Sequence, residues 1–224
     1  MRSVFSSVVL VMFSVIFSVS VSAANFEADI VDQQGKPLKF AVLTLQGPPG
    51  NVAIALKADM DQRDQQFAPH VLAVHSGTQI AFPNSDNVRH QVYSFSPAKR
   101  FELRLYEGTP SLPVLFDKPG VVVLGCNIHD SMLGYVYVTD DPWFAVSGGD
   151  GAIKFDQLAA GHYKVTLWHP DSADMQPVSG GEIDVPVNGL RQRFTLPVQP
   201  KDTDMDMTPA PSAFGDAFKK AAHE

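Results

Sequence analysis

The sequence predicts an all-β protein built from antiparallel sandwiches. From residue 26 onward, short runs of Val, Ile, Leu, Phe and Tyr alternate with Gly, Pro, Asn and Asp, and almost no stretch carries a sustained helical period. The separating segments have turn chemistry, as in Lys118-Pro119-Gly120 and Gly149-Asp150-Gly151, which supply the preset and positive φ angles that tight turns require. Many short strands at regular spacing favour a sandwich over a parallel α/β sheet.

The strand candidates are runs of apolar, aromatic and β-branched residues bounded by such turns. They cover 26–32, 40–46, 71–77, 78–84, 91–96, 101–107, 120–126, 134–140, 152–158, 162–169, 181–187 and 191–197. The polar interval 57–66 lacks a run of this kind. We expect it to form an inter-domain loop or a short helix.

The first residues have the features of a secretory signal peptide. Arg2 precedes an apolar run, and the small residues Val21-Ser22-Ala23 provide a cleavage-type exit. Serines interrupt the run, which barely reaches the roughly 20 apolar residues of a membrane span, so cleavage is favoured over an uncleaved anchor. We therefore predict that residues 1–23 are removed, that the mature chain contains no membrane span, and that it is periplasmic or secreted.

The composition is acidic, with 24 Asp and Glu residues against 17 Lys and Arg residues and a net charge of −7. Such a chain repels nucleic acid and anionic lipid, and it favours a partner that presents a basic face. Beyond Pro197 the composition changes to Pro, Asp and Ala. Residues 199–224 are predicted to be a disordered tail.

Cys126 is the only cysteine of the chain. Exported proteins usually place cysteines in disulfide pairs, so a single one requires another explanation. A buried inert thiol and an intermolecular disulfide are the simplest alternatives. The neighbouring residues point elsewhere, because His129 and Met132 follow Cys126 within one short loop between the strands predicted over 120–126 and 134–140.

His90, which directly precedes the strand predicted over 91–96, can supply a second imidazole. Two His and one Cys with a weak axial Met form the ligand set of blue-copper electron-transfer sites. The soft sulfur ligands suit Cu(I), whereas the imidazoles suit both oxidation states. Metal binding also deprotonates the thiol, which accounts for an unpaired cysteine in an oxidising compartment. The sequence predicts one copper ion per chain, held by His90, Cys126, His129 and Met132.

These residues resemble the cupredoxins, and the Cys-x2-His-x2-Met spacing is most similar to that of amicyanin. The stretches 70–108 and 116–140 also resemble exported proteins labelled methylamine utilization proteins. The resemblance implies a cupredoxin Greek-key β-sandwich over 51–140. Amicyanin-like loops are apolar where this chain has Asp130, and this departure from the family pattern predicts a more polar or charge-guided encounter with partners.

The segment 144–170 resembles the small transthyretin-like sandwich of carboxypeptidase regulatory domains, and 26–47 is similar to its first two strands. This resemblance implies that residues 25–50 and 141–198 form one sandwich into which the cupredoxin is inserted. The alternative is two consecutive domains, with 25–50 belonging to the cupredoxin.

The predicted function is single-electron transfer between redox partners such as a cytochrome c and an exported dehydrogenase. The alternative is a periplasmic copper chaperone or storage protein, in which Met205 and Met207 of the tail would make transient Cu(I) contacts. An enzyme is not expected, because four protein ligands leave no open coordination position, although a mononuclear copper enzyme stays open as a hypothesis.

His70 and His75 are two further histidines near the predicted site residues. The separation of His70 and His75 along one predicted strand places them on opposite faces, so they cannot both join one site. A surface or capping role is expected for each. Tyr135 and Tyr137 alternate along a strand and are expected to take part in core and cross-strand packing.

Overall fold

A computed structural model describes residues 23–48, 55–110 and 112–198. The predicted signal peptide apart from Ala23, and the tail with Met205 and Met207, lie outside the described residues. Within the described part, the all-β prediction is confirmed, because its single helical element is the short 3-10 helix η1 (Ala173–Met175). The described residues contain no helix that is long and apolar enough to cross a membrane.

The strands are β1 (Ala23–Val31), β2 (Val42–Gln46), β3 (Lys57–Asp59), β4 (Asp61–Arg63), β5 (Gln66–Ala68), β6 (Val71–His75), β7 (Thr78–Ala81), β8 (His90–Ser96), β9 (Lys99–Tyr106), β10 (Val114–Phe116), β11 (Gly120–Gly125), β12 (Leu133–Thr139), β13 (Trp143–Val146), β14 (Ala152–Ala159), β15 (Gly161–Trp168), β16 (Val178–Val185) and β17 (Leu190–Thr195). Each strand range expected from the sequence overlaps an observed strand, whereas β3, β4, β5, β10 and β13 were not expected.

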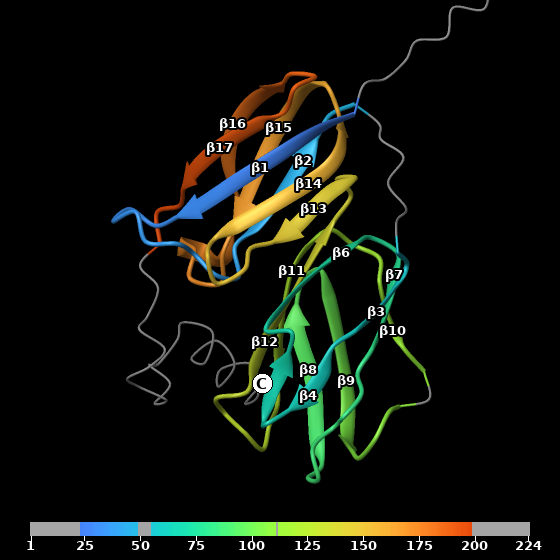
Figure 1. Ribbon diagram of the computed structural model, residues 1–224. Helices are drawn as coiled ribbons and strands as arrows, with labels where there is room; N and C mark the ends of the chain where they lie inside the picture. The colour runs from blue at the N-terminus through green and yellow to red at the C-terminus, as the bar shows by residue number, and fades with distance from the viewer. Residues whose placement is uncertain (1–22, 49–54, 111, 199–224) are drawn as a thin grey trace, which may run out of the picture.

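Strands from the two ends of the described chain share sheets. Strands β1 and β2 pair with later strands in the sheets β14-β1-β17 and β13-β2-β15-β16, which we call the terminal sandwich. Strands β3 to β12 pair among themselves in the sheets β10-β7-β3 and β6-β12-β11-β8-β9 and the hairpin β4-β5, which we call the central sandwich. Figure 1 shows the terminal sandwich above the central one. The family of each sandwich and the exact domain boundaries stay predictions.

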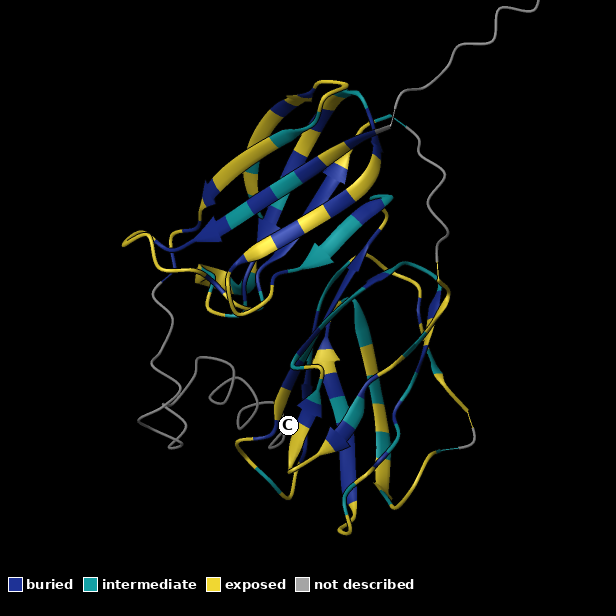
Figure 2. Cartoon of the chain, in the orientation of Figure 1, coloured by how far each residue is buried: buried dark blue, intermediate teal, exposed yellow. Residues whose placement is uncertain are grey.

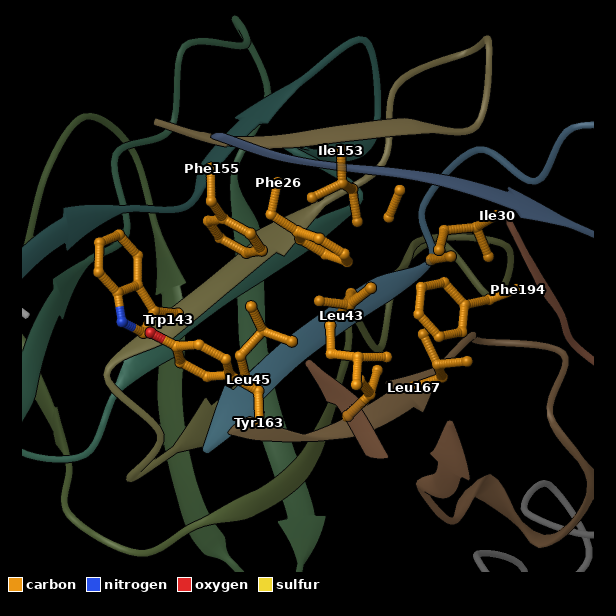
Figure 3. Close-up of a cluster of buried hydrophobic side chains, with 14 of the residues drawn as sticks. Phe26, Ile30, Leu43, Leu45, Trp143, Ile153, Phe155, Tyr163, Leu167 and Phe194 are labelled. Carbon is orange, nitrogen blue, oxygen red and sulfur yellow. The ribbon is translucent and has the colours of Figure 1, made fainter. Parts of the chain in front are cut away.

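The core of the terminal sandwich lies between its two sheets. Phe26 of β1 is fully buried and stacks on Phe155 of β14, with ring centroids 6.3 Å apart. Leu43, Leu45 and Tyr163 project toward these rings from the opposite sheet (Figure 3). The alternation of buried and exposed positions along the strands follows the two-residue repeat of a half-buried sheet (Figure 2). Burial of each large apolar side chain stabilises the fold by about 1.5–3 kcal/mol.

The central sandwich has a separate core, and a third buried cluster lies where the two sandwiches meet. The core of the central sandwich includes Phe67, Phe82 and Phe116 together with Cys126 and Met132. The third cluster is formed by Val42 and Trp168 of the terminal sandwich and by Val71 and Tyr137 of the central one. Trp168 is fully buried, so the two sandwiches share a packed apolar contact.

The expectation of a loop or short helix over 57–66 is wrong, because this interval contributes to β3, β4 and β5. The hairpin turn places Asp64 and Gln65 at φ 54 and φ 57, a left-handed pair that the sequence reaches without glycine. Met60 and the polar Gln62 are both fully buried. The polar composition of this interval gives no strand signal. Gln62 can nevertheless be buried, because its amide donates to the carbonyl of Pro83 at 3.2 Å and to the Tyr106 hydroxyl.

Candidate metal centre

The loop 126–132 connects two adjacent antiparallel strands. Strands β11 and β12 pair from Gly120↔Val138 to Gly125↔Leu133, so both ends of the loop are fixed by the same ladder. Within the loop, the amide of Met132 donates a hydrogen bond to the carbonyl of His129 at 2.9 Å. This turn folds the chain back and brings the side chains of Cys126 and His129 to one end of the central sandwich.

His90 is the first residue of β8, and the sheet register places it level with this loop. Tyr93 of β8 pairs with Gly125 at the end of β11, and the two strands are antiparallel. Three residues before Tyr93, the chain therefore lies beyond the end of β11, where the loop begins. His90 is fully buried there.

The structure brings His90, Cys126 and His129 together. One potential ligand atom from each lies within 4.8 Å of the others. The sulfur of Cys126 is 3.8 Å from Nδ1 of His90, and the two imidazole rings have centroids 5.0 Å apart. Sulfur and nitrogen ligands that share one metal ion, at distances of about 2.3 and 2.0 Å, are separated by a similar length.

The fourth predicted ligand, Met132, is the last residue of the loop, directly before β12. Its side chain is 1 % exposed and belongs to the same buried cluster as Cys126, which is 2 % exposed. The thiol is free, because Cys126 is the only cysteine.

The donor chemistry of this cluster fits a metal ion. Nδ1 of His129 is buried and has no hydrogen-bond partner, which is a costly arrangement for a ring nitrogen unless a ligand satisfies it. A thiol, two imidazoles and a buried thioether are a soft and borderline set that suits copper. His90, Cys126, His129 and Met132 are therefore the residues that would hold the ion.

Asp86 was not singled out from the sequence, and it contacts the predicted ligand His90. Oδ2 of Asp86 lies 2.7 Å from Nε2 of His90, so Nδ1 is left facing the sulfur. Burial alone would raise the pKa of Asp86, but the hydrogen bonds from the Gln65 amide, from His90 and from the Asp64 amide outweigh it, and the pKa is lowered. The carboxylate is therefore anionic and orients the imidazole.

Asn84 shapes the loop that carries Asp86 and His90. Its side-chain amide donates to the carbonyls of Val88 at 2.9 Å and Tyr106 at 3.0 Å, and its side-chain oxygen accepts from the amide of Asp86 at 3.1 Å. The hydroxyl of Tyr106 in turn donates to the carbonyl of Phe82 at 2.8 Å. Burial raises the pKa of Tyr106 to about 12, so this hydroxyl stays protonated. These contacts make the loop before His90 a rigid support.

No protein-family model matches the chain, and no curated protein matches it. Among solved structures, it is similar to a Cu-containing nitrite reductase from Thermus scotoductus SA-01, with 23% identity over 42% of this chain, and a TM-score of 0.35. The chain spans 27% of the length of that reductase.

Two smaller proteins are similar over comparable shares of the chain. A purple cupredoxin from Nitrosopumilus maritimus has 21% identity and a TM-score of 0.33, covering 37% of this chain and 99% of its own. An amicyanin mutant in its reduced state has 17% identity and a TM-score of 0.33, covering 43% of this chain and 99% of its own.

Proposed function

We propose that this chain is an exported type 1 copper protein that carries single electrons between redox partners. The observation that carries the proposal is the convergence of His90, Cys126 and His129 at one point, with Met132 in the same apolar core as Cys126. When bound, copper would supply a one-electron couple that no side chain of the cluster offers by itself.

The residues around the ligands favour a fixed coordination geometry. Asp86 holds the ring of His90, and the antiparallel pairing of β11 with β12 holds both ends of the ligand loop. A site that keeps its shape when the metal changes oxidation state exchanges electrons with little rearrangement. This arrangement supports electron transfer more than copper storage, which requires ready exchange of the ion.

The surface beside His129 supports an encounter with another protein. His129 is partly exposed, and the side chains of Ile128 and Leu133 next to the loop are 49 % and 40 % exposed. Asp130 is exposed between them. We propose a redox protein such as a cytochrome c or an exported dehydrogenase as the partner, with apolar contact near His129 and charge guidance from acidic residues.

We also propose that the central sandwich is a cupredoxin domain inserted into the terminal sandwich, and that the whole protein is periplasmic or secreted. Joint membership of β1 and β14 in one sheet supports the insertion. The transthyretin-like character of the terminal sandwich and the resemblance to methylamine utilization proteins stay predictions.

A visible absorption spectrum of the copper-loaded protein tests the proposed function. The oxidised protein should show an intense sulfur-to-copper band that disappears on reduction and returns on oxidation. Cys126→Ser should abolish the band, whereas Ser131→Ala, in the same loop, should keep it. A copper-loaded native protein without this band would refute the proposal.

A further inference from the structure

The terminal sandwich packs against the strand that leaves the ligand loop. Strand β12 begins at Leu133, directly after Met132. Its residues Tyr135 and Tyr137 both contact Trp168 of the terminal sandwich, with ring centroids 5.7 Å apart in each pair. The first residues after Met132 therefore lie under the contact between the two sandwiches.

Phe40, in the turn before β2, has a strained backbone and is held at this contact. Its φ is 72°, which a bulky residue rarely adopts. The turn is secured by Ser147: the amide of Phe40 donates to the Ser147 carbonyl at 3.1 Å, and the Ser147 hydroxyl donates to the Leu38 carbonyl at 2.6 Å. Strain of this kind persists only where the surrounding structure imposes it, and it is concentrated at positions with a function.

The ring of Phe40 lies against His70 of the central sandwich. The two ring centroids are 4.9 Å apart, and the ring of His70 also contacts that of Tyr135, with centroids 5.3 Å apart. His70 is thus partly buried where the two sandwiches meet. The expectation that it has a surface or capping role does not describe this environment.

His70 makes two backbone contacts with the start of β12. Its carbonyl accepts a hydrogen bond from the amide of Tyr135 at 2.9 Å. Burial lowers the pKa of the His70 ring, and the backbone of Leu133, the residue that follows Met132, lies near enough to the ring to act in the opposite direction. A displacement of His70 would therefore be transmitted, through its carbonyl and its ring, to the backbone that follows Met132.

We propose that Phe40 and His70 are positioning residues through which the terminal sandwich fixes the backbone at Leu133 and so the placement of the Met132 thioether. This inference rests on the proposed copper site for its effect on the metal. The link itself, from Phe40 through His70 to Leu133 and Tyr135, involves only side chains and backbone of the chain. It can therefore be tested with and without copper.

Phe40→Gly is the most informative variant. It removes the ring that contacts His70, and glycine accepts a φ of 72° without strain, so the fold is retained. Gln157→Gly is the matched control, because Gln157 also has a positive φ, of 63°, and lies exposed in β14 of the terminal sandwich. Both variants relieve strain, but only the first removes the contact with His70.

The first measurement is amide hydrogen exchange of Tyr135 in the metal-free protein. Phe40→Gly should accelerate this exchange by about tenfold or more, because the carbonyl of His70 that accepts the Tyr135 amide loses its support. Gln157→Gly should leave the rate unchanged. Equal exchange rates in native protein and Phe40→Gly would overturn the link, whatever the metal does.

The second measurement is the visible spectrum and reduction potential of the copper-loaded protein. Phe40→Gly should shift both in the same direction as Met132→Leu, which removes the thioether, whereas Gln157→Gly should match the native protein. If the native protein binds no copper in a coloured site, the proposed function fails while the exchange result still decides the link. A spectrum of Phe40→Gly identical to the native one, beside an altered Met132→Leu, would refute the positioning role.

Two substitutions of His70 separate positioning from simple packing. His70→Gln keeps an N–H donor for the Leu133 backbone, whereas His70→Leu fills space without one. We expect His70→Leu to reproduce the changes of Phe40→Gly and His70→Gln to restore the native spectrum at least in part. Equal behaviour of the two variants would show that volume alone matters and would contradict the proposal.

Discussion

The carboxylate of Asp86 lies 2.7 Å from Nε2 of His90, on the side of the ring opposite to the nitrogen that faces Cys126. The same carboxylate accepts the amides of Asp64 at 2.7 Å and Gln65 at 3.0 Å from the β4-β5 hairpin. Asp86 therefore joins a separate hairpin to a predicted metal ligand. A carboxylate that holds the second nitrogen of a ligating histidine fixes the ring and raises its basicity.

Replacing Asp86 with Asn should weaken copper binding and raise the reduction potential. The neutral amide donates less charge to His90, so Cu(II) loses more stabilisation than Cu(I). Loss of such a supporting residue typically lowers metal affinity by about 10–100-fold. Competition titration with a copper chelator and a potentiometric titration measure the two effects.

Asp130→Asn is the control for Asp86→Asn, because it removes the same charge from an exposed residue of the ligand loop. It should change the potential only slightly, since solvent and salt screen an exposed charge. If both substitutions shifted the potential and the affinity equally, the hydrogen bond to His90 would have no special role.

Copper should stabilise the folded protein, and His129 should be needed for this effect. Its buried Nδ1 has no partner within the described structure, so the metal-free site is left with an unsatisfied polar atom. A ligand that binds the folded state alone, at about 1,000 times its Kd, adds about 4 kcal/mol to the free energy of unfolding. Denaturant unfolding with and without Cu(II) measures this increment.

His129→Phe should abolish the increment while leaving the metal-free protein at least as stable, because it replaces an orphaned polar ring with an apolar one. His75→Phe is the control, since the ring of His75 lies away from the cluster and contacts the carbonyl of Ser76 at 2.8 Å. Copper stabilisation that survives in His129→Phe would place the ion elsewhere.

Local patterns in the sequence were sufficient to predict most strands and three residues that the structure brings together. Alternating apolar residues mark a strand wherever its partners are also apolar, as along β12 and β15. Cys126 and His129 lie in one short loop, so their proximity follows from chain length alone. His90 required a further inference, that its strand reaches the same end of the sheet.

Contacts between distant polar residues could not be predicted in this way. Gln62 is buried because its amide meets the Pro83 carbonyl and the Tyr106 hydroxyl, both far along the chain. Asp86 reaches His90 because Asn84 folds the intervening loop, and His70 meets Phe40 only after the two sandwiches are assembled. In each case a polar or charged residue carries no periodic signal, and tertiary structure decides its role.

The ion pair between Asp29 of β1 and Arg191 of β17 should make a contribution to stability that depends on pH. The guanidinium donates to both carboxylate oxygens, at 3.0 and 2.9 Å, and this hydrogen bonding lowers the pKa of Asp29 below its ordinary value of 3.8. Because the pKa is lower in the folded state, the ion pair makes its full contribution to stability above the ordinary pKa of Asp29. The contribution is lost as the pH falls through the lower, folded-state pKa.

Arg191→Gln should therefore unfold more easily than the native protein at neutral pH, and the difference should disappear in acid. Arg193→Gln is the control, because Arg193 affects Asp29 only through its charge. Denaturant midpoints measured from pH 7 downward test the prediction. The pair is exposed, so added salt should also reduce the difference. A difference that persists in acid would assign the effect to packing instead.

Two glycines flank the ligand loop, and alanine at each should have unequal effects. A Cβ at Gly134 would lie 2.6 Å from Cβ of Phe67, whose ring is 2 % exposed and cannot move away. A Cβ at Gly125 would lie 2.6 Å from the hydroxyl of Tyr93, the far end of a half-buried side chain that can rotate. Gly134→Ala should therefore destabilise the metal-free protein by about 1–3 kcal/mol, the usual cost of overpacking.

Gly125→Ala should cost less than about 1 kcal/mol, because Tyr93 can yield and because alanine is favoured over glycine in a strand. Denaturant unfolding of both variants gives the comparison, and Gly134→Ala combined with Phe67→Leu tests its cause. The smaller and differently branched leucine should relieve part of the clash, so the double variant should lose less than the sum of the two single losses. Strict additivity would mean that the backbone near Met132, and not the ring of Phe67, limits what position 134 can accept.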